Sequence, residues 1–405
     1  MTSGILYISY DGMLEPLGQS QVLAYLERLS EGRRIHLISF EKAADWNDDE
    51  RRSRLTQRIA GAGIHWHPLR YHKSPSAPAT AYDIAVGSAR AVAIARKYGL
   101  GIVHARSYVA GVMALAVKRM TGARLLFDMR GFWADERVDG NLWPAGGSLY
   151  RAAKRVERVL LAASDHVVTL THASETEMRT WPYLQERMPP ISVIPTCADL
   201  RRFALQGPPQ RNPFVLGYVG SVATWYLLDE MLRCFVLLKQ MHPNARLLLV
   251  NRNEHALIGQ RLQGAGIQSS DVELVAADHA EIPQLIARMS AGMALIKPAY
   301  SKISSAATKL AEYLGCGIPC LGNEGVGDMG EILEPNRVGI ALKDFSDDAL
   351  RDAMSRLVTL GEDPGLQARC RRTAEALFSL DGGVQAYSDI YEALQPSVRR
   401  MATAA

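Results

Sequence analysis

The chain has 405 residues, too many for one ordinary core, and this length predicts two domains of roughly 200 residues each. Its composition, 48% apolar and 22% charged, is typical of a globular protein in water, and a net charge of +4 is too small to indicate nucleic-acid binding. No apolar run approaches the roughly 18 residues of a membrane span, and MTSGILYISYDG lacks the basic start and long apolar centre of a signal peptide. We therefore expect a cytoplasmic protein.

Short apolar runs alternate with helical patterns through the first half of the chain. The runs are ILYIS, IHLISF, IHWHPL, IVHA, RLLFD, HVVTL and ISVIP, and a helix is expected over residues 19–29. Near-continuous apolar strands separated by helices indicate a parallel sheet covered on both faces. The first half therefore predicts a doubly wound α/β domain.

The pattern restarts after the proline-rich segment QGPPQRNP. The second series of runs is FVLGYVG, RLLLV, VELVA, GMALI and IPCLG, again with helices between them. We expect Rossmann-like domains at residues 1–205 and 206–379. Ligands bind such sheets at the carboxyl ends of the strands, which would face a cleft between the domains.

Three loops of the first domain carry polar or flexible residues where that cleft should lie. YDGMLEPLGQSQ follows the first strand, and its Gly18, just before a helix, suits close approach of the backbone to a phosphate or sugar, although an ordinary turn glycine is an equal alternative. Candidate residues at other strand ends are found in HARSY and FDMRGFWADER. The first-domain candidates are Asp11, His104, Arg106, Asp128, Arg130 and Trp133.

The segment YRAAKRVERVLLAAS is a basic, amphipathic helical pattern. Its cations are Arg151, Lys154, Arg155 and Arg158. Such a helix suits contact with an anionic membrane surface, here the inner face of the cytoplasmic membrane. The alternative is a solvated helix face packed on the core.

The second domain repeats the arrangement of strand, glycine and helix start in GYVGSVATWY, which places Gly220 and Ser221 at a strand end. LLLVNRNEH ends its strand near Arg252. An arginine there suits bidentate contact with a diphosphate, although an exposed salt bridge is as plausible.

The segment SSAATKLAEYLGCGIP predicts an amphipathic helix that begins at Ser304. Its polar arc holds Ser304, Ser305, Thr308, Lys309 and Glu312. Hydroxyls at a helix start, together with a lysine, favour a phosphate, whereas the glutamate suits sugar hydroxyls. An ordinary surface helix is the alternative interpretation.

These segments together resemble the retaining glycosyltransferases of family 4, which have the two-domain GT-B architecture. The resemblance covers most of the chain, from ILYISYDG and PLGQSQ through VIPTCADLRRF and YVGS to TKLAEYLGCGIP and EGVGDMGEIL. It implies that the second domain binds a nucleoside diphosphate sugar, that the first domain binds the acceptor, and that final helices at about 380–398 cross back onto the first domain.

The resemblance also implies roles for particular residues. Glu312 would bind the donor ribose, the helix start with Thr308 and Lys309 would bind the diphosphate, and Gly18 would let the first domain reach it. Donor contacts are further expected at Gly220, Ser221, Ser304 and Ser305, and acceptor contacts at Asp11, His104, Arg106 and Trp133. The family's first glutamate is replaced by Ser304, and Ser221 and Tyr226 stand where an arginine and a lysine are usual. We therefore expect Lys309, Arg252 and Arg130 to meet the leaving-group charge.

The implied reaction is transfer of a sugar to an acceptor hydroxyl, with retention, in polysaccharide or glycoconjugate biosynthesis. The leaving phosphate is the expected base, with Asp128 and His104 as weaker candidates. No metal-ligand cluster stands in a predicted cleft loop, and the five cysteines are scattered, so we expect no metal, no cofactor and reduced structural thiols. A nucleotide-sugar epimerase or hydrolase, and a non-catalytic nucleotide-sugar-binding protein, remain alternatives.

Overall fold

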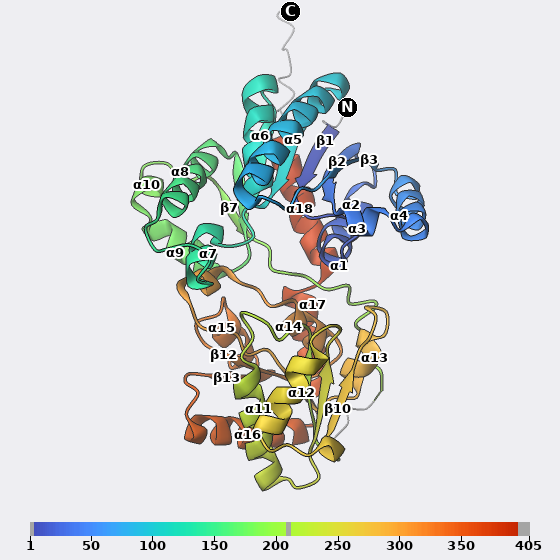
Figure 1. Ribbon diagram of the computed structural model, residues 1–405, viewed down its shortest axis with the longest axis vertical. Helices are drawn as coiled ribbons and strands as arrows, with labels where there is room; N and C mark the ends of the chain where they lie inside the picture. The colour runs from blue at the N-terminus through green and yellow to red at the C-terminus, as the bar shows by residue number, and fades with distance from the viewer. Residues whose placement is uncertain (1–3, 208–211, 396–405) are drawn as a thin grey trace, which may run out of the picture.

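The computed structural model describes residues 4–207 and 212–395 and shows two parallel α/β domains stacked along the long axis (Figure 1). Within the described residues, the first domain has seven parallel strands in the order β3-β2-β1-β4-β5-β6-β7. The strands are β1 (Gly4–Ser9), β2 (Ile35–Glu41), β3 (His65–Arg70), β4 (Leu100–Arg106), β5 (Arg124–Asp128), β6 (His166–Thr169) and β7 (Ile191–Val193). Each coincides with a predicted run.

Helices cover this sheet, which explains why every residue of β1 and β2 is buried, including the polar side chains of His36, Ser39 and Glu41 in β2. The helices are α1 (Pro16–Gly18), α2 (Ala24–Leu29), α3 (Ala43–Trp46), α4 (Asp49–Gly61), α5 (Ser76–Tyr98), α6 (Ser107–Thr121), α7 (Trp133–Asp139), α8 (Ser148–Ala163), α9 (His172–Thr180) and α10 (Pro182–Gln185). The predicted helix over 19–29 is a π-helical turn, η1 (Gln19–Leu23), continued by α2.

The second domain has six parallel strands within the described residues, in the order β10-β9-β8-β11-β12-β13. They are β8 (Val215–Val219), β9 (Arg246–Val250), β10 (Val272–Val275), β11 (Ala291–Met293), β12 (Cys320–Asn323) and β13 (Gly339–Leu342), the last of which was not predicted. The helical elements are α11 (Leu228–Met241), α12 (His255–Gly264), η2 (Ser269–Asp271), α13 (Ile282–Ala287), η3 (Tyr300–Ser304), α14 (Thr308–Gly315), α15 (Met329–Leu333), α16 (Asp347–Glu362) and α17 (Leu366–Leu377).

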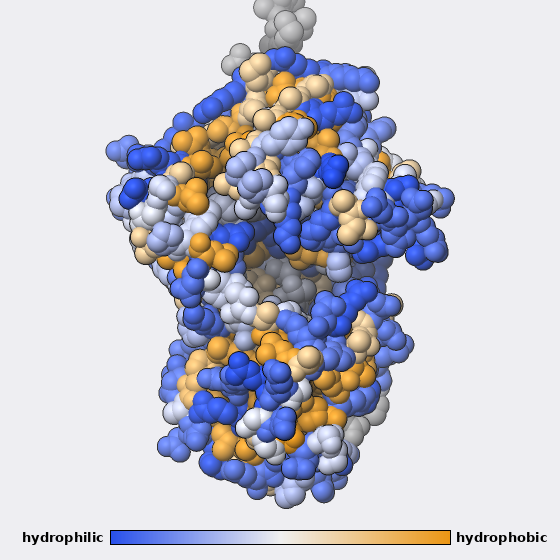
Figure 2. Space-filling model, in the orientation of Figure 1, coloured by the Kyte–Doolittle hydropathy of each residue, from blue (hydrophilic) through white to orange (hydrophobic). Residues whose placement is uncertain are grey.

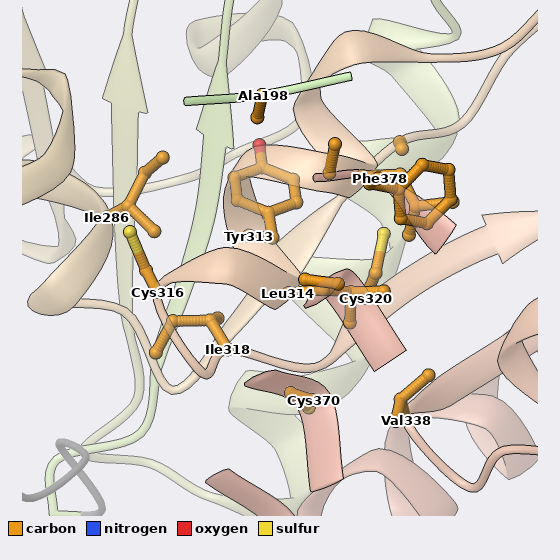
Figure 3. Packing of buried hydrophobic residues seen from close by; sticks show 14 of the residues in the cluster. Ala198, Ile286, Tyr313, Leu314, Cys316, Ile318, Cys320, Val338, Cys370 and Phe378 are labelled. Carbon is orange, nitrogen blue, oxygen red and sulfur yellow. The ribbon is translucent and has the colours of Figure 1, made fainter. Parts of the chain in front are cut away.

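The core of the second domain holds α14 in place. Tyr313 and Leu314 point from this helix into a buried apolar cluster with Ala198 and Phe378 (Figure 3). Gly292 in β11 is required there, because a Cβ atom at this position would lie 2.5 Å from the Tyr313 ring. All five cysteines are buried and free.

The final helix, α18 (Leu380–Leu394), packs its apolar side chains with those of β1 in the first domain. A parallel bridge joins Ala198 and Ser379 where the chain passes between domains, and Arg28 forms ion pairs with Asp199 and Asp381 beside it. Residues 396–398 of the predicted crossover segment lie outside the described residues. The domain limits at 205 and 379 stay predictions.

The two domains touch along one side, where α7 and α9 lie directly above α15 (Figure 1). Figure 2 shows the surface hollowed between them. Because the strands are parallel, the loops at their carboxyl ends gather at one edge of each sheet. Among the helices of residues 4–207 and 212–395, none has the length and apolar character that a membrane crossing requires.

Candidate active site

The predicted start of the helix at Ser304 is wrong. Ser304 ends the short 3-10 turn η3, the chain then runs extended through Ser305, and α14 begins only at Thr308. The Ser304 hydroxyl accepts a hydrogen bond from the Phe132 backbone N–H at 2.9 Å and donates one to the Ser301 carbonyl at 2.7 Å. The two serines therefore lie outside the first turn of α14, and Ser304 links the two domains.

Lys309 is a buried cation in the first turn of α14, rather than a residue on a wet face. Lys309 is only 6% exposed, and its Nζ donates to the Tyr218 hydroxyl at 3.0 Å. Nζ also lies 3.5 Å from the centroid of the Tyr226 ring. Burial lowers the pKa of Lys309 to about 7, against the opposing charge of Glu312. Within the described residues Lys309 Nζ forms no ion pair, so this buried ammonium is suited to binding an anion.

The loop after β8 approaches the same ammonium. Gly220 has a φ of 124°, which favours glycine, and a Cβ atom there would lie 3.5 Å from Lys309 Nζ. The Tyr218 hydroxyl donates in turn to the Ser221 carbonyl. The Ser221 hydroxyl itself donates to Glu254 at 2.8 Å. The structure therefore brings the Gly220 backbone close to Lys309 and links the Ser221 carbonyl to it through Tyr218, and the donor contacts expected at both residues stay predictions.

Glu312 lies one turn after Lys309 and is half-buried. Burial raises the pKa of this carboxyl to about 7, while the charges of Lys309 and Arg202 oppose the rise. Arg252, the other cation predicted to bind the diphosphate, has a side chain that is 64% exposed and lies 3.5 Å from Asp278. The exposed salt bridge considered for Arg252 is therefore the observed arrangement.

A second charged cluster occupies the carboxyl ends of β1, β4 and β5 in the first domain. Register pairing sets Arg106 beside Asp128, and Arg106 Nε donates to Asp11 at 3.3 Å. Arg130 adopts a φ of 59°, and its guanidinium lies 3.9 Å from Asp128. Burial would raise the pKa of Asp128, but the nearby charges of Arg130 and Arg106, together with His104 at 3.9 Å, outweigh it and lower that pKa.

Burial corrects the roles predicted for His104 and Asp128, each only 1% exposed. His104 Nδ1 shares a hydrogen bond of 2.7 Å with the Tyr391 hydroxyl of α18, and Asp128 accepts from Tyr387 at 3.0 Å. Burial also lowers the pKa of His104. In this conformation neither side chain reaches an acceptor, and a carboxyl with a lowered pKa is a poor base. Both residues tie α18 to the first domain.

Packing also changes the interpretation of two other first-domain residues. A Cβ atom on Gly18 would lie 2.0 Å from the Gly12 carbonyl oxygen, so this glycine is required for the loop to fold back on itself. Trp133 stacks on Tyr108 with ring centroids 5.7 Å apart. Asp11, whose side chain is 42% exposed, is more accessible than Arg106 and His104, which are 5% and 1% exposed.

Sequence reasoning missed a group of side chains between the domains. Lys302 of η3 donates from Nζ to Glu136 of α7 at 2.7 Å, and the same Nζ lies 3.7 Å from the centroid of a Trp225 ring. Glu136 stood in the charged loop noted above, but Lys302 and Trp225 carried no signal. Their proximity depends on the docking of η3 against α7.

Helix α8 presents a mixed outer face. Arg151, Arg155 and Arg158 are exposed there, interleaved with exposed apolar side chains, which are Leu149, Val156 and Val159. Lys154 does not belong to this face: its Nζ contacts Asp135 at 3.1 Å and also pairs with the buried Glu157. The predicted membrane contact at Lys154 is therefore wrong.

Comparisons with known proteins agree with this architecture. Residues 20–197 match the glycosyl transferase 4-like domain, and residues 203–376 match the glycosyl transferases of group 1. Sucrose-phosphate synthase from Thermosynechococcus elongatus superposes with a TM-score of 0.67 at 15% identity, over 97% of this chain and 99% of that one. A comparison with curated proteins found no match.

Two further solved structures are similar over nearly their whole length. A glycosyltransferase from Rickettsia africae gives a TM-score of 0.70 at 15% identity, over 97% of this chain and 98% of that chain. Anabaena HepE, solved with UDP and glucose, gives a TM-score of 0.66 at 15% identity, over 96% of this chain and 100% of that chain. Two doubly wound parallel sheets facing a cleft, with these structural neighbours, constitute the GT-B fold. The chain belongs to the group 1 glycosyltransferases and has a family 4-like first domain.

Proposed function

We propose that this enzyme is a retaining glycosyltransferase that moves a sugar from a nucleoside diphosphate sugar to an acceptor hydroxyl in polysaccharide or glycoconjugate biosynthesis. The observation that carries the proposal is Lys309, a buried ammonium between Tyr218 and Tyr226 beside the Gly220 loop. A buried cation without an anionic partner is costly, and a diphosphate provides the missing charge. HepE, a structural neighbour, was solved with UDP-glucose.

The rest of α14 fits the remainder of such a donor. Glu312 is on the same helix one turn further from the diphosphate, and its carboxylate can accept hydrogen bonds from a pair of ribose hydroxyls. Thr308 is at the first position of the helix, where free N–H groups favour phosphate oxygens. We therefore place the diphosphate at the amino end of α14, with the ribose beside Glu312.

In the proposed reaction, the bond between the anomeric carbon and the diphosphate breaks as the acceptor oxygen bonds to the same face of that carbon. The acceptor proton passes to the departing phosphate. Charge separation dominates the barrier, and we propose that Lys309 and Arg130 stabilise the leaving group. Losing one such contact costs about a hundredfold to a thousandfold in rate. We propose that these cations make a metal ion unnecessary.

The acceptor would approach from the first domain. Asp11 is held by Arg106 but keeps an exposed carboxylate, which suits an acceptor hydroxyl. We further propose that α8 rests on an anionic membrane at the inner face of the cytoplasmic membrane. The arginines Arg151, Arg155 and Arg158 would contact the headgroups while the interleaved apolar side chains enter the boundary. A lipid-linked acceptor would then be presented next to the first domain.

Donor binding tests the central claim. Titration of the purified enzyme with UDP-, GDP- and ADP-glucose should identify one that binds, and Lys309→Met should weaken that affinity at least tenfold. Lys239→Met is the matched control, because Lys239 lies in the last turn of α11, near the amino ends of the strands of the same sheet, and pairs with Asp271. Equal affinities for the parent and Lys309→Met would refute the assignment.

Turnover assays separate the remaining alternatives. Sugar release or isomerisation from the donor alone, without an acceptor, would favour a hydrolase or epimerase. Binding without turnover across a panel of hydroxyl acceptors would favour a non-catalytic nucleotide-sugar-binding protein. Transfer that needs an acceptor and keeps the anomeric configuration would support the proposal.

A further inference from the structure

We propose that Glu136 of α7 reaches across the cleft and accepts hydrogen bonds from hydroxyls of the transferred sugar, with Lys302 as its positioning residue. This inference rests on the donor site described under the proposed function. It assigns the sugar-recognising carboxylate to the first domain, and thereby makes sugar recognition depend on contact between the two domains.

The carboxylate of Glu136 is fixed on one side only. Its Oε1 atom accepts from Lys302 Nζ at 2.7 Å, and its side chain is 42% exposed. Within residues 4–207 and 212–395, no hydrogen bond to the other oxygen, Oε2, is found. A carboxylate held at one oxygen and open at the other suits hydroxyl groups, which donate to it.

Lys302 fixes this geometry because it is itself immobilised. Its side chain is only 7% exposed and lies against the Trp225 ring, 3.7 Å from the centroid to Nζ. The Trp225 ring approaches Gly140, the residue after α7, where an added Cβ would lie 3.2 Å from the ring. These contacts hold the Lys302 side chain in one orientation, directed from the second domain toward α7.

Two consecutive residues of the loop after β8, Trp225 and Tyr226, connect Glu136 to the Lys309 ammonium. Tyr226 follows Trp225, and its ring contacts Lys309 Nζ. Trp225, the residue before Tyr226, is the ring against which Lys302 Nζ lies while it donates to Glu136. In agreement with this geometry, the negative charges of Glu136 and Glu312 add to the effect of burial in raising the pKa of Tyr226. The transferred sugar is bonded directly to the diphosphate. Glu136 approaches this region from the first domain, whereas the proposed ribose contact, Glu312, is on α14 of the second domain, and we therefore assign Glu136 to the sugar.

Neighbouring polar groups are less suited to this role. The Ser304 hydroxyl is committed to the Phe132 N–H and the Ser301 carbonyl. Asp135 of α7 accepts from Tyr150 at 2.9 Å through one oxygen and from Lys154 at 3.1 Å through the other. Glu136 therefore differs from Ser304 and Asp135, because its second carboxylate oxygen is open to a ligand.

The test compares binding of a nucleoside diphosphate with binding of its sugar conjugate. UDP, GDP and ADP and their glucose conjugates are titrated, and the pair that binds the parent is used. Glu136→Gln should leave the affinity for the bare diphosphate unchanged within about twofold. It should weaken the sugar conjugate about tenfold, because a hydrogen bond to a charged group is lost. It should also reduce discrimination between the glucose and galactose conjugates in kcat/KM.

Asp139→Asn is the matched control, since Asp139 is also on α7 and accepts across the domain contact from the Ser301 N–H at 2.8 Å. It should leave both affinities unchanged. An equal loss for diphosphate and conjugate in Glu136→Gln, or the same selective loss in Asp139→Asn, would show that domain contact rather than sugar recognition is affected, and would overturn the inference. A parent that binds none of the six ligands would instead refute the donor site itself.

Discussion

The pH dependence of donor binding tests the state of Lys309 directly. With its pKa lowered to about 7 by burial, the free enzyme loses the ammonium charge as pH rises above 7. A bound diphosphate stabilises the charged form, so binding takes up a proton above pH 7, and affinity should fall about tenfold per pH unit there. Between pH 7 and pH 9 the expected loss is about fiftyfold, since half of the lysine is already neutral at pH 7.

Glu312 determines how donor affinity changes with pH below 7. Its pKa is raised to about 7 by burial, so below pH 7 the carboxyl is protonated in the free enzyme. Because the ribose hydroxyls favour the ionised form, binding at acidic pH must release a proton, and affinity should fall as pH decreases. The two limbs predict a maximum near pH 7.

Calorimetric titration at pH 5.5 to 9 in buffers of different ionisation enthalpy measures both the affinity and the protons exchanged. The ligand should be the nucleotide-sugar, because the terminal phosphate of a free diphosphate titrates near pH 6 itself. Lys309→Met should flatten the alkaline limb and Glu312→Gln the acidic one. A parent profile that is flat between pH 6 and pH 9, or an alkaline slope that persists in Lys309→Met, would refute the reasoning.

Three other perturbations have defined outcomes. A ligand at about 100 times its Kd stabilises the native state by about 2.7 kcal/mol, and Glu312→Ala should abolish that thermal shift while the unliganded melting temperature changes little. Tyr391→Phe leaves Nδ1 of buried His104 without its partner and should cost about 1–3 kcal/mol in urea unfolding; a cost near zero would contradict the structural role of this bond. Arg155→Glu with Arg158→Glu should abolish binding to vesicles rich in anionic lipid without changing donor affinity, and unchanged vesicle binding would remove α8 from the membrane proposal.

The strand pattern was predictable because burial on both faces leaves a signal in every residue of a strand. RLLFD and RLLLV coincide with β5 and β9 to the residue. β13 (GIAL) was not predicted, although all four of its residues are buried. Local sequence thus contained most of the fold, although one fully buried strand, no shorter than several predicted ones, was missed.

The candidate site was less predictable because long-range contacts decide it. The periodicity of SSAATKLAEYLG suits a helix from Ser304, but the Phe132 N–H from the other domain takes that hydroxyl and holds the segment in a 3-10 turn. His104 stood at a strand end that should face the cleft, yet Tyr391, 287 residues later, covers it. Neither partner is visible in the local pattern.

The position of Lys309 explains how the site can lack the lysine expected at 226. The ring of Tyr226 lies against the Lys309 ammonium, and we propose that α14 supplies the cation that was expected from position 226 of the loop after β8. This predicts a rescue: Tyr226→Lys combined with Lys309→Met should recover most of the diphosphate affinity that Lys309→Met loses, because the new side chain starts beside the same point. Tyr226→Phe combined with Lys309→Met is the control and should recover none. If both double variants fold and bind equally weakly, the charge cannot be exchanged between the two elements, and Lys309 acts by something other than its position next to Tyr226.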